Sequence, residues 1–128
     1  GETPVGALVV RDGVVLGEGR NAREADADPT AHAELVALRA AAAHDGDWRL
    51  AGATLYVTLE PCPMCAGATI QTHVALVVYG APNPRDGALG SVVDLGAGPF
   101  KRMPEVRGGV RAREASALLE RFFAARRA

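Results

Sequence analysis

The sequence predicts one α/β domain, residues 1–128, with a mixed sheet of five strands. Three observations support this prediction: β-rich runs near the amino terminus, a strand, helix, strand pattern in the middle and an amphipathic helix at the end. A chain of 128 residues has the usual length of a single domain. No internal repeat or domain boundary interrupts the pattern.

The first part of the sequence predicts a hairpin followed by a helix. Residues 5–10 and 14–19 are β-rich runs, and Asp12-Gly13 between them is a strong signal for a tight turn. Asp28-Pro29-Thr30 is typical of a helix start. Apolar residues then recur at helical spacing toward Gly46, at Ala31, Leu35, Leu38 and Ala42.

The middle of the sequence predicts a right-handed crossover between two parallel strands. Residues 53–58 alternate like a third strand, a helix should then run to about Thr72, and residues 74–79 form an apolar run typical of a buried strand. Cys62 and Cys65 therefore follow the carboxyl end of a strand. Open α/β sheets bind ligands at that edge.

The last part predicts a long loop, a fifth strand and a final helix. Residues 80–104 are rich in Gly and Pro, as in a functional loop, and residues 106–110 favour a strand. The apolar face of the last helix is formed by Ala115, Leu118, Leu119, Phe122 and Phe123.

Cys62 and Cys65 are the only two cysteines, and their spacing places both sulfurs on one face of a helix's first turn. Pro63 fits there, because a proline at the first helical position loses no needed N–H. The unpaired N–H groups of that turn favour the thiolate, which is the form that binds metal. His32, in the first turn of the preceding helix, would supply a third ligand.

Three protein ligands leave a fourth tetrahedral position for water, which is the pattern of catalytic zinc sites. Zinc lowers the pKa of bound water from about 15.7 to about 7. Glu34, two residues after His32, can then take the proton of this water and deliver it to a substrate nitrogen.

His32-Ala33-Glu34 and Pro61-Cys62-Pro63-Met64-Cys65 together match the H-x-E and P-C-x-x-C signature of the zinc nucleobase deaminases. The competing interpretation is a pair of buried thiols or a redox C-x-x-C pair. A redox pair does not require a His-x-Glu upstream, so the combination favours the zinc enzyme.

With these residues in place, the chain resembles the bacterial tRNA adenosine deaminases of the cytidine-deaminase-like superfamily. The matching blocks are residues 28–34, 54–68, 87–91 and 117–123. The resemblance implies a three-layer fold with a five-stranded mixed sheet, zinc-site helices on one face and a C-terminal helix. It also implies a homodimer.

The activity implied by the resemblance is hydrolysis of the wobble adenosine of a tRNA anticodon to inosine. Hydroxide on zinc would attack C6 of adenine while Glu34 protonates N1 and then the departing ammonia. Asn21 would hydrogen-bond the base or its ribose, and backbone N–H groups near Ala33 and Cys62 would hold the base edge and the hydroxide. Asn83, in the loop after the fourth strand, would contact the ribose.

The sequence departs from the family pattern in three places. Family members begin with an additional helix, which we expect to be missing because Gly1 lies almost on the first strand. Asn83 stands where the family commonly has Asp, so we expect weaker discrimination between RNA and DNA. The family's Asn-His-Arg is replaced by Lys101-Arg102-Met103.

The net charge of −1 is unevenly distributed. From Lys101 onward, eight basic residues face three acidic ones, so this segment carries +5 and the rest −6. A basic segment can contact phosphates or can simply be a solvated helix face. The candidates for contact with nucleic acid are Lys101, Arg102, Arg126 and Arg127.

Two alternatives stay open at this point: a small-molecule guanine or cytosine deaminase, and a zinc-dependent RNA-binding module without catalysis. Residues 87–91 and Leu59 resemble the tRNA enzymes more than the guanine deaminases. The sequence contains no apolar run of transmembrane length, no signal peptide and no surplus cysteine. We therefore expect a soluble protein of the cytoplasm without a membrane partner.

Overall fold

The computed structural model describes residues 3–127, except for the side chains at 116, 118, 119, 122, 123 and 125–127 in the last helix. Its elements, in chain order, are β1 (Gly6–Arg11), β2 (Val14–Arg20), α1 (Ala33–Asp45), β3 (Thr54–Leu59), α2 (Pro63–Gln71), β4 (Leu76–Ala81), a 3₁₀ turn η1 (Leu95–Ala97), β5 (Glu105–Arg107) and α3 (Ala112–Arg127).

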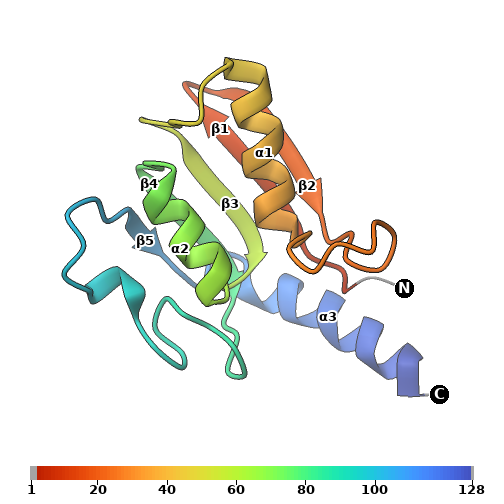
Figure 1. Ribbon diagram of the computed structural model, residues 1–128. Coiled ribbons are helices and arrows are strands. Elements are labelled where there is room, and N and C mark those ends of the chain that lie inside the picture. Colours follow the sequence, from red (N-terminus) through yellow and green to blue (C-terminus); the bar gives the residue numbers. More distant parts are fainter. Residues whose placement is uncertain (1–2, 128) are drawn as a thin grey trace.

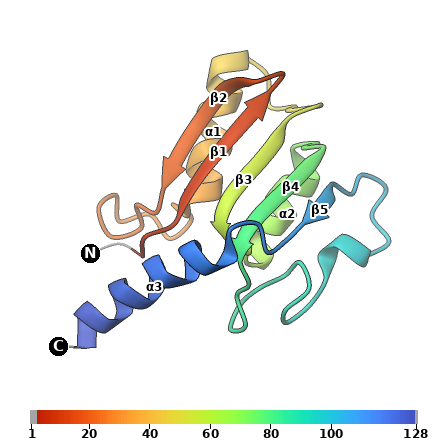
Figure 2. The ribbon, with the colours of Figure 1, turned by 180° about the vertical axis from the view of Figure 1, so that it is seen from behind.

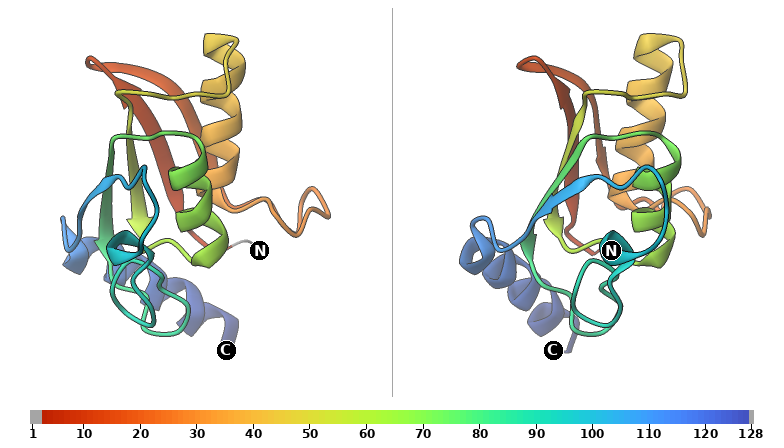
Figure 3. Two further views of the ribbon diagram at one scale, coloured as in Figure 1. Left: turned by 60° about the vertical axis from the view of Figure 1, so that its left-hand side comes forward. Right: turned by 90° about the vertical axis from the view of Figure 1, so that its left-hand side faces the viewer.

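The five strands form one mixed sheet in the order β2-β1-β3-β4-β5. β1 is antiparallel to both β2 and β3, whereas β3, β4 and β5 are mutually parallel. α1 and α2 lie side by side on one face of the sheet (Figure 1). α3 lies across the other face, near the carboxyl ends of β3 and β4 (Figures 2 and 3). This arrangement confirms the predicted three-layer α/β fold.

The first hairpin forms where the sequence predicts it. Asp12 and Gly13 both have positive φ, 50° and 77°, as a tight turn of type I′ requires. The strands on either side then pair from Arg11 with Val14 to Gly6 with Arg20.

α1 begins at Ala33, so the predicted helix start at residues 28–30 is wrong. The Asp28 carboxylate instead accepts the N–H and the hydroxyl of Thr30, at 2.9 and 2.7 Å, and closes a local turn. The N–H of Ala33 donates to Oδ1 of Asn21 at 2.8 Å. A distant side chain therefore caps α1, and His32 is its N-cap residue.

Two glycines of β2 determine how closely α1 approaches the sheet. A Cβ at Gly17 would lie 2.5 Å from both the Ala37 carbonyl oxygen and the Ala41 nitrogen, and Gly19 is equally crowded. Ala33, Ala37 and Ala41 are fully buried at this contact. Small residues on both sides thus fix α1, and with it His32 and Glu34, against the sheet.

The crossover from β3 through α2 to β4 is confirmed, although β4 begins two residues later than predicted. His73 has a φ of 64° at the end of α2, and the N–H of Ala75 donates to the Ala53 carbonyl at 2.9 Å before the strand begins. β5 is shorter than predicted. The next residue, Gly108, lies so close to the Tyr79 ring that a Cβ there would collide with it.

The final helix is present as predicted. Of its predicted apolar face, Ala115 is half-buried and lies near Gly80, whereas Leu118, Leu119, Phe122 and Phe123 lie outside the described side chains. Within residues 3–127, no helix combines the length and the apolar character needed to span a membrane.

Candidate metal and catalytic site

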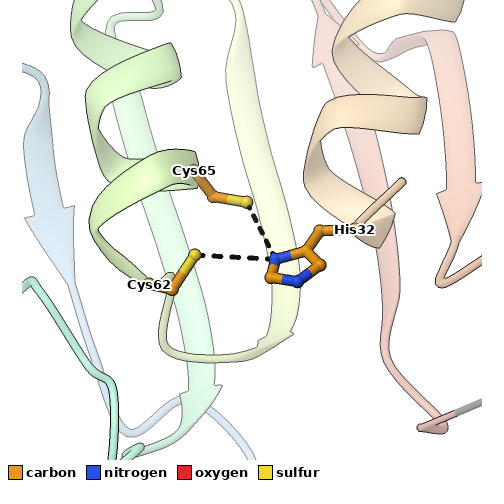
Figure 4. Close-up of side chains that lie close together, drawn as sticks. All are labelled: His32, Cys62 and Cys65. Atoms are coloured by element: carbon orange, nitrogen blue, oxygen red, sulfur yellow. Dashed lines mark hydrogen bonds between the residues drawn. The ribbon is translucent and has the colours of Figure 1, made fainter. Parts of the chain in front are cut away.

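Three side chains from two helix starts converge at one point. His32 precedes α1, Cys62 precedes α2, and Cys65 lies in the first turn of α2. Nδ1 of His32 lies 3.5 Å from the Cys62 sulfur and 3.4 Å from the Cys65 sulfur (Figure 4). The three donor atoms all lie within 4.8 Å of one another, so one ion can contact all three.

The pKa values of the two thiols show how well this pair suits a cation. The hydrogen bond from the Cys65 thiol lowers the pKa of Cys62 to about 5, helped by the backbone N–H groups of Cys65 and Met64 and by His32. The same hydrogen bond raises the pKa of Cys65, as do burial and Glu34. One thiolate is therefore present at neutral pH, and a bound cation favours the second.

The donor set fits zinc. Two sulfurs and one imidazole nitrogen are typical zinc ligands, and three protein ligands leave one position for water. No fourth His, Cys, Asp or Glu of the described residues joins the group. His44 lies in the last turn of α1 and His73 follows α2, so neither closes the site.

Glu34 lies in the first turn of α1 and is only 5% exposed. Burial raises the pKa of its carboxyl group, which the Glu34 backbone N–H and His32 only partly oppose. The Cys65 thiol is also within hydrogen-bonding reach of the carboxylate. A carboxyl group with a raised pKa beside a metal site is suited to carry protons at neutral pH.

Asn21 and Ala33 are joined to each other at the start of α1. The Ala33 N–H donates to Oδ1 of Asn21, so this N–H is already engaged. Within the described residues, we observe no hydrogen bond from the amide nitrogen of Asn21. The two residues thus lie beside the site, and their contacts with a substrate stay a prediction.

Asn83 lies in the loop after β4, and its own side chain shapes that loop. Its Oδ1 accepts the N–H groups of Arg85 and Asp86, at 3.3 and 3.1 Å. Its backbone N–H donates to Oε1 of Glu60 at 3.2 Å. Asn83 is therefore connected to the segment that leads into Cys62, and its contact with a substrate also stays a prediction.

Lys101 and Arg102 do not lie at the metal site. Arg102 lies 3.3 Å from Nδ1 of His73, near the start of β4, whereas Cys62 follows the carboxyl end of β3. Because β3 and β4 are parallel, these are opposite ends of the sheet. The side chains of Arg126 and Arg127 lie outside the described residues.

Glu60 is the residue whose role sequence reasoning missed. It is 1% exposed, and its carboxylate accepts hydrogen bonds from Asn83, Leu89 and Ser91. The available signal was a carboxylate directly before the Pro-Cys motif. Its partners lie more than 20 residues later, at separations of 23 to 31, so no local pattern reveals them.

Residues 1–81 match the model of the family described as the cytidine and deoxycytidylate deaminase zinc-binding region. The chain is 44% identical over 124 residues to the tRNA-specific adenosine deaminase of Bacillus subtilis, covering 96% of this chain and 77% of that protein. It is 53% identical over 123 residues to the tRNA(Ile)-lysidine synthase of Deinococcus deserti, covering 95% of this chain. The chain spans only 23% of that longer relative.

Solved structures give the same grouping. A structure from work on tRNA:A34 deaminases, which perform A-to-I editing at the wobble position of transfer RNA, superposes with a TM-score of 0.86 at 39% identity. The superposition covers 89% of this chain and 83% of that one. The guanine deaminase of Bacillus subtilis superposes with a TM-score of 0.62 at 36% identity, covering 77% and 57%.

Proposed function

The chain belongs to the family of cytidine and deoxycytidylate deaminase zinc-binding proteins, and on that premise we propose that it hydrolyses adenosine to inosine at the wobble position of a tRNA anticodon loop. The observation that carries this proposal is the convergence of His32, Cys62 and Cys65 beside the buried Glu34. The similarity to tRNA-specific adenosine deaminases over 96% of the chain supports the choice of substrate.

The three ligands would hold zinc, which when bound supplies hydroxide at neutral pH by lowering the pKa of a water molecule to about 7. Glu34 accepts the proton that the water gives up. It would deliver this proton to N1 of adenine as the water oxygen bonds to C6. It would then take the remaining proton from the new C6 hydroxyl and give it to the amino group, so that the C6–N bond breaks and ammonia leaves. The products are inosine and ammonia, and Glu34 is regenerated. Its raised pKa, caused first by burial, lets it hold a proton between these steps.

An anticodon loop suits such a site, because its bases are unpaired and can be splayed out at a cost of a few kcal/mol or less. Asn21 would donate its amide N–H to the base or ribose, while its oxygen caps α1. Because its N–H is engaged by Asn21, Ala33 would line the base without donating a hydrogen bond to it. Asn83 would contact the ribose from the neighbouring loop.

The surface that would contact the RNA is proposed from the positive charge of its residues. Arg126 and Arg127 of the last helix would grip backbone phosphates with an affinity that falls as salt rises. Lys101 and Arg102, at the other end of the sheet, could reach only a part of the RNA remote from the reacting base. We also propose that the protein is a homodimer of the cytoplasm without a membrane partner. Residues 1–128 would form its single catalytic domain.

The decisive experiment compares four substrates under the same conditions: an anticodon stem-loop, free adenosine, guanine and cytosine. Zinc content is measured on the same sample. We expect about one zinc per chain and turnover of the stem-loop to inosine. Turnover of guanine alone would exclude the tRNA substrate while preserving the zinc deaminase.

Guanine deamination is the second candidate, and the superposition with a guanine deaminase favours it. Its TM-score of 0.62 over 77% of the chain is lower than the 0.86 over 89% for the tRNA:A34 deaminase structure. A zinc-dependent RNA-binding module without catalysis is less well supported. Its metal site would normally be closed by four protein ligands, and it would not need a buried carboxyl group with a raised pKa.

A further inference from the structure

The proposed deamination gives no role to Glu60, the second buried carboxylate. Glu60 follows the last residue of β3 and is 1% exposed. Its Oε1 accepts the Asn83 N–H at 3.2 Å and the Ser91 hydroxyl. Its Oε2 accepts the N–H groups of Leu89 and Ser91, at 3.0 and 3.1 Å. One carboxylate therefore holds both ends of the loop formed by residues 83–91.

The backbone of this loop is fitted to the same segment. The Ala88 N–H donates to the Pro61 carbonyl at 2.9 Å, and the Gly87 N–H closes the loop on the Asn83 carbonyl at 2.8 Å. Gly87 passes so close to Glu60 that a Cβ there would collide with Oε2. The loop thus rests on Glu60 and Pro61, the two residues that precede the metal ligand Cys62.

The position of the loop relates it to the substrate. It leaves the carboxyl end of β4 and lies beside the start of α2, at the same end of the sheet as the metal ligands (Figures 1 and 3). The four donors need four acceptor sites, and a carboxylate provides two on each oxygen. An amide provides acceptors on one oxygen only, so glutamine cannot replace all four contacts.

We propose that Glu60 is a positioning residue that fixes loop 83–91 against the metal-binding turn, so that the loop forms a rigid wall for the incoming nucleotide. This inference rests on the proposed function. Glu60 itself does not touch the reacting atoms. It acts through Asn83, which it holds at the start of the loop. The free enzyme therefore presents a preformed wall, and the substrate does not need to order it.

Glu60→Gln tests this role. The amide oxygen can keep the Leu89 and Ser91 N–H groups, and the amide nitrogen can donate to the Ser91 oxygen, which leaves the Asn83 N–H without an acceptor. We expect hydrogen exchange at the Asn83 amide, followed by NMR, to accelerate at least about tenfold, as for loss of a hydrogen bond to a charged group. KM for the stem-loop should rise about tenfold, while kcat stays within about threefold and zinc stays at about one per chain.

Two substitutions of Ser91 should change KM less than Glu60→Gln does. Ser91→Ala removes the hydroxyl donor but keeps the backbone N–H on Glu60, so KM should rise less than in Glu60→Gln. Ser91→Thr retains a hydroxyl, so its KM should equal that of the wild type. Asp45→Asn is the matched control. It makes the same carboxylate-to-amide change at the far end of α1, where Asp45 binds Arg11 at 2.8 Å, and it should leave KM and loop exchange unchanged.

Two results would overturn the proposal. The first is zinc loss in Glu60→Gln with normal exchange at Asn83, because Glu60 would then serve the metal turn alone. The second is fast exchange with an unchanged KM, because the wall would then not contribute to binding. If the wild-type chain turns over guanine and not the stem-loop, the proposed function fails. The same KM comparison made with guanine then tests Glu60 independently.

Discussion

The start of α1 and the segment before α2 each bury a carboxylate two residues from a metal ligand, yet the surroundings of the two groups differ. Glu34 is 5% exposed and Glu60 1%, and they are the two buried carboxylates among the described residues. Burial raises the pKa of Glu34, with few hydrogen bonds to oppose it. Burial acts on Glu60 in the same direction, but the Ser91 hydroxyl and the N–H groups of Asn83, Ser91 and Leu89 outweigh it and lower the pKa.

The difference shows that the number of hydrogen-bond donors, more than burial, decides whether the pKa of a buried carboxylate is raised or lowered. A carboxylate that accepts four hydrogen bonds is held as an anion and holds its neighbours in turn. A buried carboxylate with few donors has a raised pKa and takes up a proton more readily, as general acid and base catalysis requires. Under the proposed function, the two glutamates would therefore perform separate tasks, proton transfer at Glu34 and positioning at Glu60.

The largest effect should come from Glu34→Gln. This change keeps the shape of the side chain but removes its ability to carry a proton, so inosine formation should fall by at least about 100-fold. Zinc content and affinity for the stem-loop should persist. The measurement is single-turnover deamination together with metal analysis. The control is Glu18→Gln on the exposed surface of β2, and a Glu34→Gln protein with normal turnover would remove Glu34 as the proton carrier.

A smaller effect should separate two roles of Asn21. Asn21→Asp keeps an oxygen to accept the Ala33 N–H but removes the amide donor. Thermal stability should therefore be retained while kcat/KM falls about tenfold, the loss expected for one substrate hydrogen bond. Asn21→Ala should lose the cap as well, at a cost of about 1 kcal/mol in unfolding free energy. If the Asp variant is fully active, Asn21 serves only as a cap.

A several-fold effect should follow from Asn83→Asp. The Oδ1 contacts with Arg85 and Asp86 can form with a carboxylate too, so the loop should keep its shape while a negative charge replaces the amide donor. We expect the wild-type chain to deaminate a single-stranded deoxyadenosine substrate measurably and the variant to do so less. The test is the ratio of rates on RNA and DNA hairpins of the same sequence. Equal ratios in the two proteins would discard the link between Asn83 and sugar discrimination.

The sequence predicts the parts of this site that depend on local chemistry. The Asp12-Gly13 turn and the proline after Cys62 each act within a few residues, and the structure places them as predicted. His32 lies beside the two cysteines, but as the N-cap residue of α1 and not in its first turn. The start of α1 could not be predicted, because its cap comes from Asn21, 12 residues away. The role of Glu60 could not be predicted for the same reason, since its four donors come from a loop that is brought to it only by the β3 to β4 crossover.

The smallest effect should come from Asp45→Asn, which changes the free energy of unfolding. Asp45 is a carboxylate nearer the surface than Glu34 and Glu60, and it is paired with Arg11. The hydrogen bond from Arg11, at 2.8 Å, lowers the pKa of Asp45 below its ordinary 3.8, although partial burial opposes the shift. A carboxyl group whose pKa is lower in the folded state stabilises the fold above its ordinary pKa, and this stabilisation is lost as the pH falls through the lowered value. Wild type should therefore exceed Asp45→Asn slightly in unfolding free energy at pH 7, with the difference shrinking as the pH falls below 3.8. Urea unfolding of both proteins at several pH values measures this difference, and loss of metal in acid affects both alike. A difference that stays constant with pH would mean that Arg11 does not stabilise the ionised form.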